Sequence, residues 1–247
     1  MSDESGKYDG FALIYNRHWG PRYAEAALET LEPLLLSRIP PGARILDLCC
    51  GSGQTSRRLE DRGYRVTGID ESASLIEFAK LNSPKSTFAV ADARHFNLPA
   101  HFRAAISLND SLNHLLAIDD LRAAFRHVHA CLVPGGVFVF DLNLAHKYET
   151  SWAGSMAIVD NDAACAVIAS SDVPRRTARF DAAVFNKAAE VWTRKDVQLV
   201  QTWYRPEEVT SALEAAGFID MGITDRTGNH LQRLDVNKAF FAASKRS

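Results

Sequence analysis

Residues 44–54 read Arg-Ile-Leu-Asp-Leu-Cys-Cys-Gly-Ser-Gly-Gln, a pattern that predicts a strand, a tight turn and a helix. The first half is apolar apart from Asp47, as in a buried central strand of a parallel sheet. Gly51 and Gly53 permit a sharp turn and let a ligand approach the backbone closely. Because ligands of open α/β sheets bind at the carboxyl ends of strands, this turn is a candidate binding loop.

The loop differs from two common nucleotide-binding motifs. It has no Gly-Lys-Ser/Thr ending, which disfavours a P-loop nucleotide site. The G-x-G-x-x-G spacing is also absent, because an alignment that starts at residue 49 has Cys49 in place of glycine and one that starts at Gly51 has Ser56 in place of glycine. A nicotinamide-dependent oxidoreductase is disfavoured for the same reason.

An acid follows each of the next two predicted strands. The strand over 64–69 ends at Asp70, and the strand over 87–91 ends at Asp92. A carboxylate at the first position can accept hydrogen bonds from both hydroxyls of a ribose. Either acid can instead cap the helix or turn that follows it.

The rest of the chain predicts an α/β class with a doubly wound, Rossmann-like, seven-stranded sheet and an antiparallel β insertion after strand five. The other expected strands of the sheet are 104–108, 132–141, 218–224 and 238–243; the helices are near 21–37, 54–62, 72–82, 118–131 and 206–216. We expect one domain over 1–247. It comprises an N-terminal helical cap at 1–40 and a substrate-covering insertion at 145–205, although the insertion can also be a dimer surface.

The order of these motifs resembles the small-molecule branch of the class I S-adenosylmethionine (SAM) methyltransferases. Asp-x-Cys-x-Gly-x-Gly resembles their motif I, and Leu-Val-Pro-Gly-Gly at 132–136 resembles the turn into their fifth strand. The resemblance covers about residues 8 to 145. It implies SAM as cofactor and S-adenosylhomocysteine as product. The cofactor-binding positions it implies here are Cys49, Gly51 and Gly53 near the methionine, Asp70 and Glu71 near the ribose, and Asp92 and Ala93 near the adenine.

The segment Ser107–Leu115 follows predicted strand four. It resembles the segment of glycine N-methyltransferases and amino-sugar N,N-dimethyltransferases that ends in His-Leu. The resemblance places His114 at the acceptor amine as a base or orienting residue, and an imidazole titrates near neutrality. It also implies that Asn109 contacts the methionine amino group. Alternatively, His114 only begins a helix and Asn109 only closes a turn.

Residues 11–19 (Phe-Ala-Leu-Ile-Tyr-Asn-Arg-His-Trp) resemble the "FAxxYD" pattern of many small-molecule methyltransferases, with Asn16 in place of Asp. The resemblance implies that Tyr15 closes over the methionine end of SAM, as a cofactor-binding or catalytic residue. An aromatic face beside a sulfonium makes a cation–π contact. Arg17 is expected to pair with the methionine carboxylate, and Trp19 is placed in the same group. Arg17 and Trp19 can equally serve packing alone.

These features predict a SAM-dependent methyltransferase that acts on a small molecule, with an amine nitrogen favoured. Asn143 stands where glycine N-methyltransferases have an arginine for the acceptor carboxylate, which argues against glycine. An O-methyltransferase, a SAM-using enzyme with another outcome and a catalytically silent SAM-binding regulatory or scaffold protein are the alternatives.

Composition narrows the partners. The chain has 247 residues, a net charge of −2 and 47% hydrophobic residues, typical of a globular protein. We expect no nucleic-acid or membrane partner, because there is no strong basic excess and no long apolar run. The four cysteines form no CxxC pair, so we predict no metal site and a cytoplasmic location. A monomer or a homodimer is expected.

Overall fold

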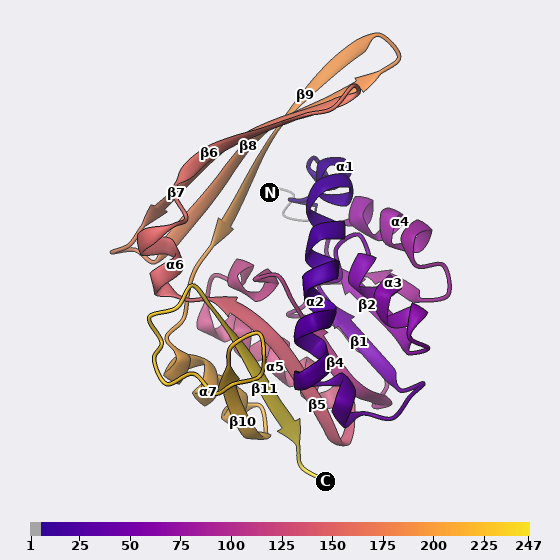
Figure 1. The fold of residues 1–247 in the computed structure, drawn as a ribbon, viewed down its shortest axis with the longest axis vertical. Helices are drawn as coiled ribbons and strands as arrows, with labels where there is room; N and C mark the ends of the chain where they lie inside the picture. The colour runs from indigo at the N-terminus through magenta and orange to yellow at the C-terminus, as the bar shows by residue number, and fades with distance from the viewer. Residues whose placement is uncertain (1–5) are drawn as a thin grey trace.

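The large sheet of the protein has seven strands in the order β10-β11-β5-β4-β1-β2-β3. The computed structural model describes residues 6–247, and Figure 1 shows the arrangement. The strands are β1 (Arg44–Leu48), β2 (Arg65–Asp70), β3 (Thr87–Val90), β4 (Phe102–Ser107), β5 (Leu132–Asn143), β10 (Phe218–Thr224) and β11 (Lys238–Lys245). The first five run parallel, whereas β11 runs antiparallel to both of its neighbours, β5 and β10. The predicted Rossmann-like sheet is therefore confirmed.

Helices cover both faces of this sheet because successive side chains of a strand point to opposite sides. Ile45 and Ile106 pack with α2 (Gly20–Leu34) and α3 (Gln54–Asp61), whereas Leu46 and Ala105 pack with α5 (Ile118–Cys131) and α7 (Pro206–Ala215). In Figure 1, α2 crosses in front of β1 and β4. Helix α4 (Ala73–Asn82) packs on Phe88 of β3. No helix within residues 6–247 is long and apolar enough to cross a membrane.

The helix predicted near 21–37 begins earlier in the structure, within the region predicted as a helical cap. It begins at α1 (Ala12–Ile14), continues through the π-helical turn η1 (Tyr15–Trp19) into α2, and is followed by η2 (Leu36–Arg38). The apolar periodicity over 21–37 reflects only the part of this helical region that faces the large sheet. Phe11 and Ile14 instead pack against the insertion, so their burial follows a different partner. A π-helical turn holds one more residue than an α-helical turn, which changes the facing of the residues around it.

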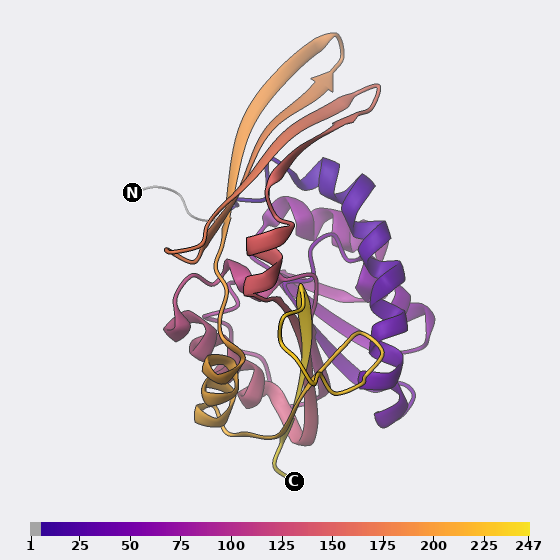
Figure 2. The ribbon, with the colours of Figure 1, turned by 60° about the vertical axis from the view of Figure 1, so that its left-hand side comes forward.

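A second, antiparallel sheet follows β5, as predicted. It consists of β6 (Gly154–Val159), β7 (Ala163–Asp172), β8 (Thr177–Ala188) and β9 (Val191–Gln201), paired in that order. Figure 2 shows this second sheet above the end of the large sheet at which β5 ends. Two short helices, α6 (Ala145–Thr150) and η3 (Ser111–His114), were not predicted, because so few residues show no helical periodicity.

The Pro-Gly-Gly segment is not a separate turn before the fifth strand. It lies within β5, where the pairing with β4 shifts between Phe102 and Ala104. Gly135 adopts a φ of 70° at this irregularity. Leu132 pairs with Phe102 and Val137 with Ala104, so β5 holds three more residues than β4 here, and this bulge accommodates the segment without ending the strand.

Candidate functional site

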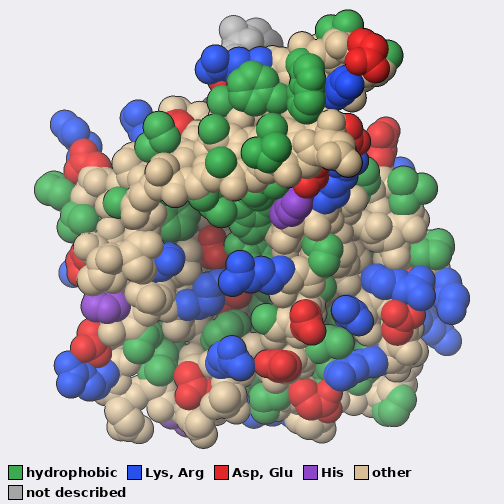
Figure 3. Space-filling model, turned by 45° about the horizontal axis from the view of Figure 1, so that its top comes forward, with side chains coloured by type: hydrophobic (Ala, Val, Ile, Leu, Met, Phe, Trp, Pro, Cys, Tyr) green, Lys and Arg blue, Asp and Glu red, His purple; other side chains and the backbone are tan. Residues whose placement is uncertain are grey.

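A cavity of about 810 Å³ lies between the carboxyl ends of the parallel strands and the insertion. Figure 3 shows the surface hollowed beneath an overhanging band, with hydrophobic side chains gathered in the hollow. The predicted site residues that line the cavity are Tyr15, Trp19, Cys49, Gly51, Asp70, Glu71, Asp92, Ala93, Asn109 and His114. Most of the predicted site residues therefore lie around one cavity.

The loop after β1 is held by the carboxylate of Asp70. One oxygen of Asp70 accepts from the backbone N–H of Gly51 at 2.9 Å, and the other accepts from the N–H of Ser72 at 3.0 Å. Burial raises the pKa of Asp70 above its ordinary value, although these two hydrogen bonds oppose the shift. A Cβ on Gly51 would lie 3.1 Å from the ring of Tyr15, so this glycine permits the close approach of Tyr15 to the loop.

Gly53 corrects one prediction, because it does not line the cavity. Its φ is 76°, and a Cβ there would lie 2.8 Å from the backbone of Ala79 in α4. Gly53 is therefore required for the close packing of the loop against α4 rather than for contact with a ligand.

Cys49 lies on the cavity wall with a left-handed backbone, at φ 59°. A residue other than glycine is strained in this region. Burial raises the pKa of its thiol well above the ordinary value, and neighbouring acids such as Asp70 add to the shift. The thiol therefore stays protonated and is a poor nucleophile.

Replacing Cys49 with glycine should raise the free energy of unfolding by about 1 kcal/mol, since the backbone strain is relieved. Chemical denaturation measures this change. Cys49→Ala is the matched control, because it removes the thiol but keeps the Cβ that causes the strain. Equal stability of the two variants would contradict the assignment of strain to the backbone.

Asp92 is an ionised acceptor at the end of β3. Arg94 donates to it through Nε at 3.0 Å and Nη2 at 2.6 Å. Burial alone would raise the pKa of Asp92, but the hydrogen bonds from Arg94 outweigh it and lower that pKa. The carboxylate thus remains available to hydrogen-bond donors of a ligand.

Arg17 is a second correction, because the structure places it outside the cavity. Its guanidinium pairs with Asp162 at 2.5 Å and with Asp160 at 3.2 Å, both in the turn between β6 and β7. A helical side chain can reach only the partner that its face presents, and this face of η1 meets the insertion. Trp19 does line the cavity, where its ring packs 5.0 Å from that of Phe11 between centroids.

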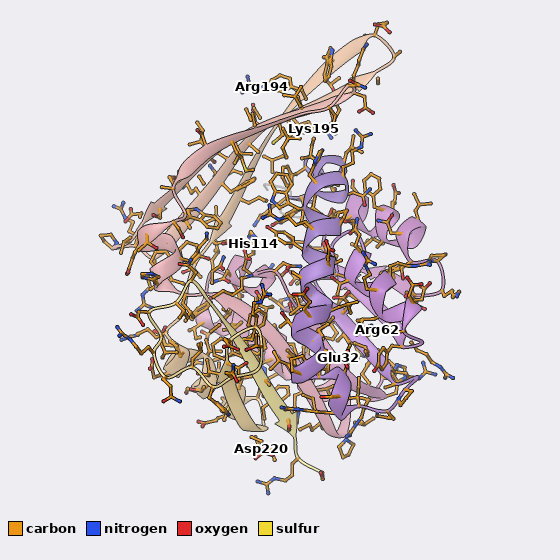
Figure 4. All side chains as sticks on the ribbon, in the orientation of Figure 1. Glu32, Arg62, His114, Arg194, Lys195 and Asp220 are labelled. Carbon is orange, nitrogen blue, oxygen red and sulfur yellow. The ribbon has the colours of Figure 1, made fainter. Side chains whose placement is uncertain are left out.

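His114 projects from η3 into the cavity, and Figure 4 shows it between the insertion and the large sheet. Its Nδ1 lies 2.8 Å from the carbonyl oxygen of Val200. Since a carbonyl oxygen only accepts, Nδ1 carries the hydrogen and Nε2 carries the lone pair. Burial lowers the pKa of His114, against the opposing effect of Asp110. The structure thus presents a neutral imidazole with a basic Nε2.

Gln201 of β9 supports the same tautomer. Its Nε2 donates to a carboxylate oxygen of Asp110 at 2.7 Å, and that acceptor fixes which end of the amide is the nitrogen. The same nitrogen lies 3.1 Å from Nε2 of His114, while the amide oxygen accepts from the hydroxyl of Tyr148 at 2.8 Å. The donor contact from Gln201 therefore requires a lone pair on Nε2 of His114.

Lys238, from the last strand β11, holds the loop after β4. Its Nζ lies 3.0 Å from Asp110 and 3.1 Å from Asp141, and Asp141 also accepts from the backbone N–H of Asn109 at 2.8 Å. Lys238 reaches this loop because β11 runs antiparallel to β5, so that its first residue pairs with Asn143, the last residue of β5. Asn109 has a φ of 62°, which this network stabilises.

Replacing Lys238 with methionine should lower the free energy of unfolding by about 3 kcal/mol, because two facing carboxylates lose their shared counter-charge. Urea denaturation measures the change. Lys147→Met is the matched control, since the ammonium of Lys147 donates to a carbonyl, that of Ser151 at 3.4 Å. Equal losses in the two variants would contradict the role of the ion pairs that Lys238 makes.

Sequence reasoning missed Tyr8, Asp110, Gln201 and Lys238, all of which line the cavity. A signal for Gln201 was present. Val197 and Leu199 face inward on β9, so Gln201 occupies the next inward position of the alternation. It is only 4% exposed, and a buried polar residue at an apolar position is informative.

The cavity fits a nucleoside cofactor with hydroxyl and amino donors. Its wall offers the carboxylates of Asp70 and Asp92 at the ends of neighbouring parallel strands. The aromatic ring of Tyr15 lies over the glycine loop beside them. Among residues 6–247 no group of three or more His, Cys, Asp or Glu side chains is arranged as a metal site.

Comparisons with known proteins agree with this donor set. A family model described as a methyltransferase domain matches residues 45–136. The dTDP-3-amino-3,4,6-trideoxy-alpha-D-glucopyranose N,N-dimethyltransferase of Streptomyces venezuelae is 26% identical over 220 residues, covering 87% of this chain and 90% of the relative.

Two solved structures share the fold. A SAM-dependent methyltransferase from Clostridium acetobutylicum ATCC 824 aligns with a TM-score of 0.76 at 18% identity, over 97% of this chain and 99% of that one. SAM-bound CalS10 of Micromonospora echinaspora, an amino pentose methyltransferase, aligns with a TM-score of 0.70 at 22% identity, over 94% and 96%. The chain is a SAM-dependent methyltransferase with the class I fold, an enzyme that uses SAM as its cofactor, and it is similar to members of the small-molecule branch.

Proposed function

We propose that this enzyme transfers a methyl group to the nitrogen of a small amine. The observation that carries the proposal is the neutral His114, whose Nε2 lone pair lies at the cavity wall. An amine must be uncharged to act as a nucleophile, and its nitrogen must lose a proton after methylation. A neutral imidazole can accept that proton near neutral pH.

The cofactor would be held by the predicted residues that the cavity gathers. Asp70, with Glu71 beside it, would accept from the ribose hydroxyls, and Asp92, beside Ala93, would accept from the adenine amino group. Gly51, Cys49 and the carbonyl of Asn109 would face the methionine. SAM supplies a sulfonium-bound methyl group, and the C–S electron pair stays on sulfur as the acceptor's lone pair forms the new bond.

The N-terminal cap and the insertion would close the acceptor side. Trp19 packs beside Phe180 of β8, with ring centroids 6.3 Å apart, and both residues line the cavity. This packing between Trp19 and Phe180 favours the assignment of residues 1–40 as a cap and of residues 145–205 as a cover over the substrate. A closed, apolar wall excludes water and strengthens the electrostatic interactions inside. It also helps to align the acceptor with the methyl group.

The relatives favour an amine of the amino-sugar type. One is named as an N,N-dimethyltransferase of a dTDP-3-amino sugar, and CalS10 is named as an amino pentose methyltransferase. The position of Asn143 has no arginine for an acceptor carboxylate, and the nearby Lys238 is already paired with two acids. We therefore favour an acceptor without a carboxylate next to its amine.

A matched pair of acceptors tests the proposal. dTDP-3-amino-3,6-dideoxyglucose and its 3-hydroxyl analogue differ only at the candidate nucleophile. A panel of simple amines and alcohols of similar size extends the comparison. With radiolabelled SAM, the amines should be methylated and the hydroxyl partners should not. Transfer to hydroxyl partners alone would replace the proposal with an O-methyltransferase.

A further inference from the structure

Tyr8 lies between the glycine loop and His114. Its ring is perpendicular to that of Tyr15, with centroids 6.1 Å apart and an interplanar angle of 88°. It is also close to His114, with centroids 5.5 Å apart and an angle of 81°. Since Tyr15 lies against Gly51, the ring of Tyr8 contacts both a residue at the cofactor loop and the base.

The hydrogen bond between Tyr8 and His114 has a defined direction. The hydroxyl oxygen of Tyr8 lies 2.9 Å from Nε2 of His114. Because Nδ1 of His114 donates to Val200, Nε2 has no hydrogen and must accept from Tyr8. Gln201 also donates toward Nε2, so protein donors already surround that lone pair. A proton that leaves a ligand in the cavity therefore reaches Nε2 most directly through the Tyr8 hydroxyl.

We propose that Tyr8 is a catalytic residue that relays the proton of the methylated nitrogen to His114. The inference rests on the proposed function, in which His114 is the final base. Once its lone pair has formed the bond to carbon, the acceptor nitrogen is cationic and acidic. Its proton passes to the hydroxyl oxygen of Tyr8 as the hydroxyl hydrogen passes to Nε2 of His114. Tyr8 ends neutral and His114 ends as an imidazolium.

Tyr8 cannot take this role without His114 behind it. Burial raises the pKa of the Tyr8 hydroxyl well above its ordinary value, and Tyr15, Asp110 and Asp70 add to the shift. A tyrosinate is therefore not populated at neutral pH. A relay avoids it, because the hydroxyl gains one proton as it gives up another.

The charged groups around His114 permit the final imidazolium. The carboxylate of Asp110, on the loop after β4, favours it, and Lys7, from the N-terminal segment, opposes it. The carbonyl of Val200 on β9 keeps its hydrogen bond in both protonation states, because Nδ1 carries a hydrogen in each. Gln201 retains its hydrogen bond to Asp110 when Nε2 becomes protonated.

Tyr8→Phe tests the relay, since phenylalanine keeps the ring and removes only the hydroxyl. The first readout needs no acceptor. With S-adenosylhomocysteine bound, long-range proton–nitrogen NMR should show neutral His114 protonated at Nδ1, assigned by its loss in His114→Gln. In Tyr8→Phe the Nε2 resonance should move toward that of a nitrogen free of hydrogen bonds. Tyr64→Phe, just before β2 and packed against the core beneath α2 and α3, is the control and should leave it unchanged, because Tyr64 does not line the cavity.

The second readout is methyl transfer to the amine that the acceptor panel methylates fastest. Tyr8→Phe should lower kcat about tenfold or more, with the KM for the amine changed less than about threefold. An unmoved Nε2 resonance, or a kcat equal to that of the wild type while His114→Gln is slow, would overturn the relay but leave His114 as base. Normal rates in both variants would instead refute the proposed role of His114.

Discussion

Replacing Asp70 with alanine should weaken the binding of S-adenosylhomocysteine about 100-fold or more, measured by calorimetric titration. Hydrogen bonds to an ionised group contribute about 1.5–3 kcal/mol each, and the variant loses those to the ribose. The variant also removes the acceptor of the Gly51 and Ser72 N–H groups, and these two hydrogen bonds order the loop. Because burial raises the pKa of Asp70, the affinity of the wild type should begin to fall at a higher pH than with an ordinary aspartate.

Two further variants make the result on Asp70 specific. Asp70→Asn keeps the shape and should still weaken binding, which separates the lost charge from any local unfolding. Asp61→Asn, on the exposed side of α3, is the matched control and should bind normally. If Asp70→Ala binds as the wild type does and Glu71→Gln does not, the ribose contact belongs to Glu71.

Replacing His114 with glutamine should lower kcat for an amine acceptor about 100-fold or more, with the affinity for S-adenosylhomocysteine nearly unchanged. The pH dependence carries the same information. Burial lowers the pKa of His114 below 6.5, so the neutral form persists as the pH falls through 6.5. The acid limb of kcat that belongs to His114 should lie below that pH and be absent in the variant, whereas any limb that belongs to the acceptor amine should be common to both proteins.

A matched control for His114 lies at the rim of the insertion. His18 pairs with Asp160 at 3.0 Å and does not line the cavity. His18→Gln should retain the rate and the pH profile of the wild type. A His114→Gln enzyme with normal kcat and the same acid limb would remove His114 from the chemistry and leave the cofactor site intact.

The sequence was sufficient for the fold because the signals were local and repeated. The parallel strands are largely apolar runs, three of which end at a polar residue, and the order of strands and helices limits the possible connections. The alternation after residue 141 likewise predicted the second sheet. The short helix α6 was not predicted, because six residues are too few to show a helical period.

The candidate site was predictable where it follows strand ends and where the N-terminal pattern places Tyr15 and Trp19. Asp70 ends β2, Asp92 lies two residues after β3, and His114 lies in the segment that follows β4, and the carboxyl ends of these parallel strands meet at one edge. Tyr8 and Lys238 reach the cavity through tertiary contacts, namely the packing of the N-terminal segment and the antiparallel course of β11. No local pattern reports such contacts.

The two corrections have physical causes of the same kind. The direction of Arg17 depends on the π-helical turn in which it lies, and that turn aims it at acids of the insertion. Gly53 has the backbone that a binding loop requires, but α4 occupies the space that its missing side chain leaves. In both positions the residue type was compatible with the predicted role, and the neighbour in space differed.

The central claim is methyl transfer to nitrogen with His114 as the base. In the most direct test, the wild type and the His114→Gln variant are each incubated with SAM that carries ¹³C in its methyl group. The acceptors are the matched amine and hydroxyl compounds. The carbon resonance of the product identifies the atom that carries the methyl group. We expect an N-methyl signal from the wild type that His114→Gln nearly abolishes. An O-methyl signal alone, or an N-methyl signal of equal size from both proteins, would contradict the account.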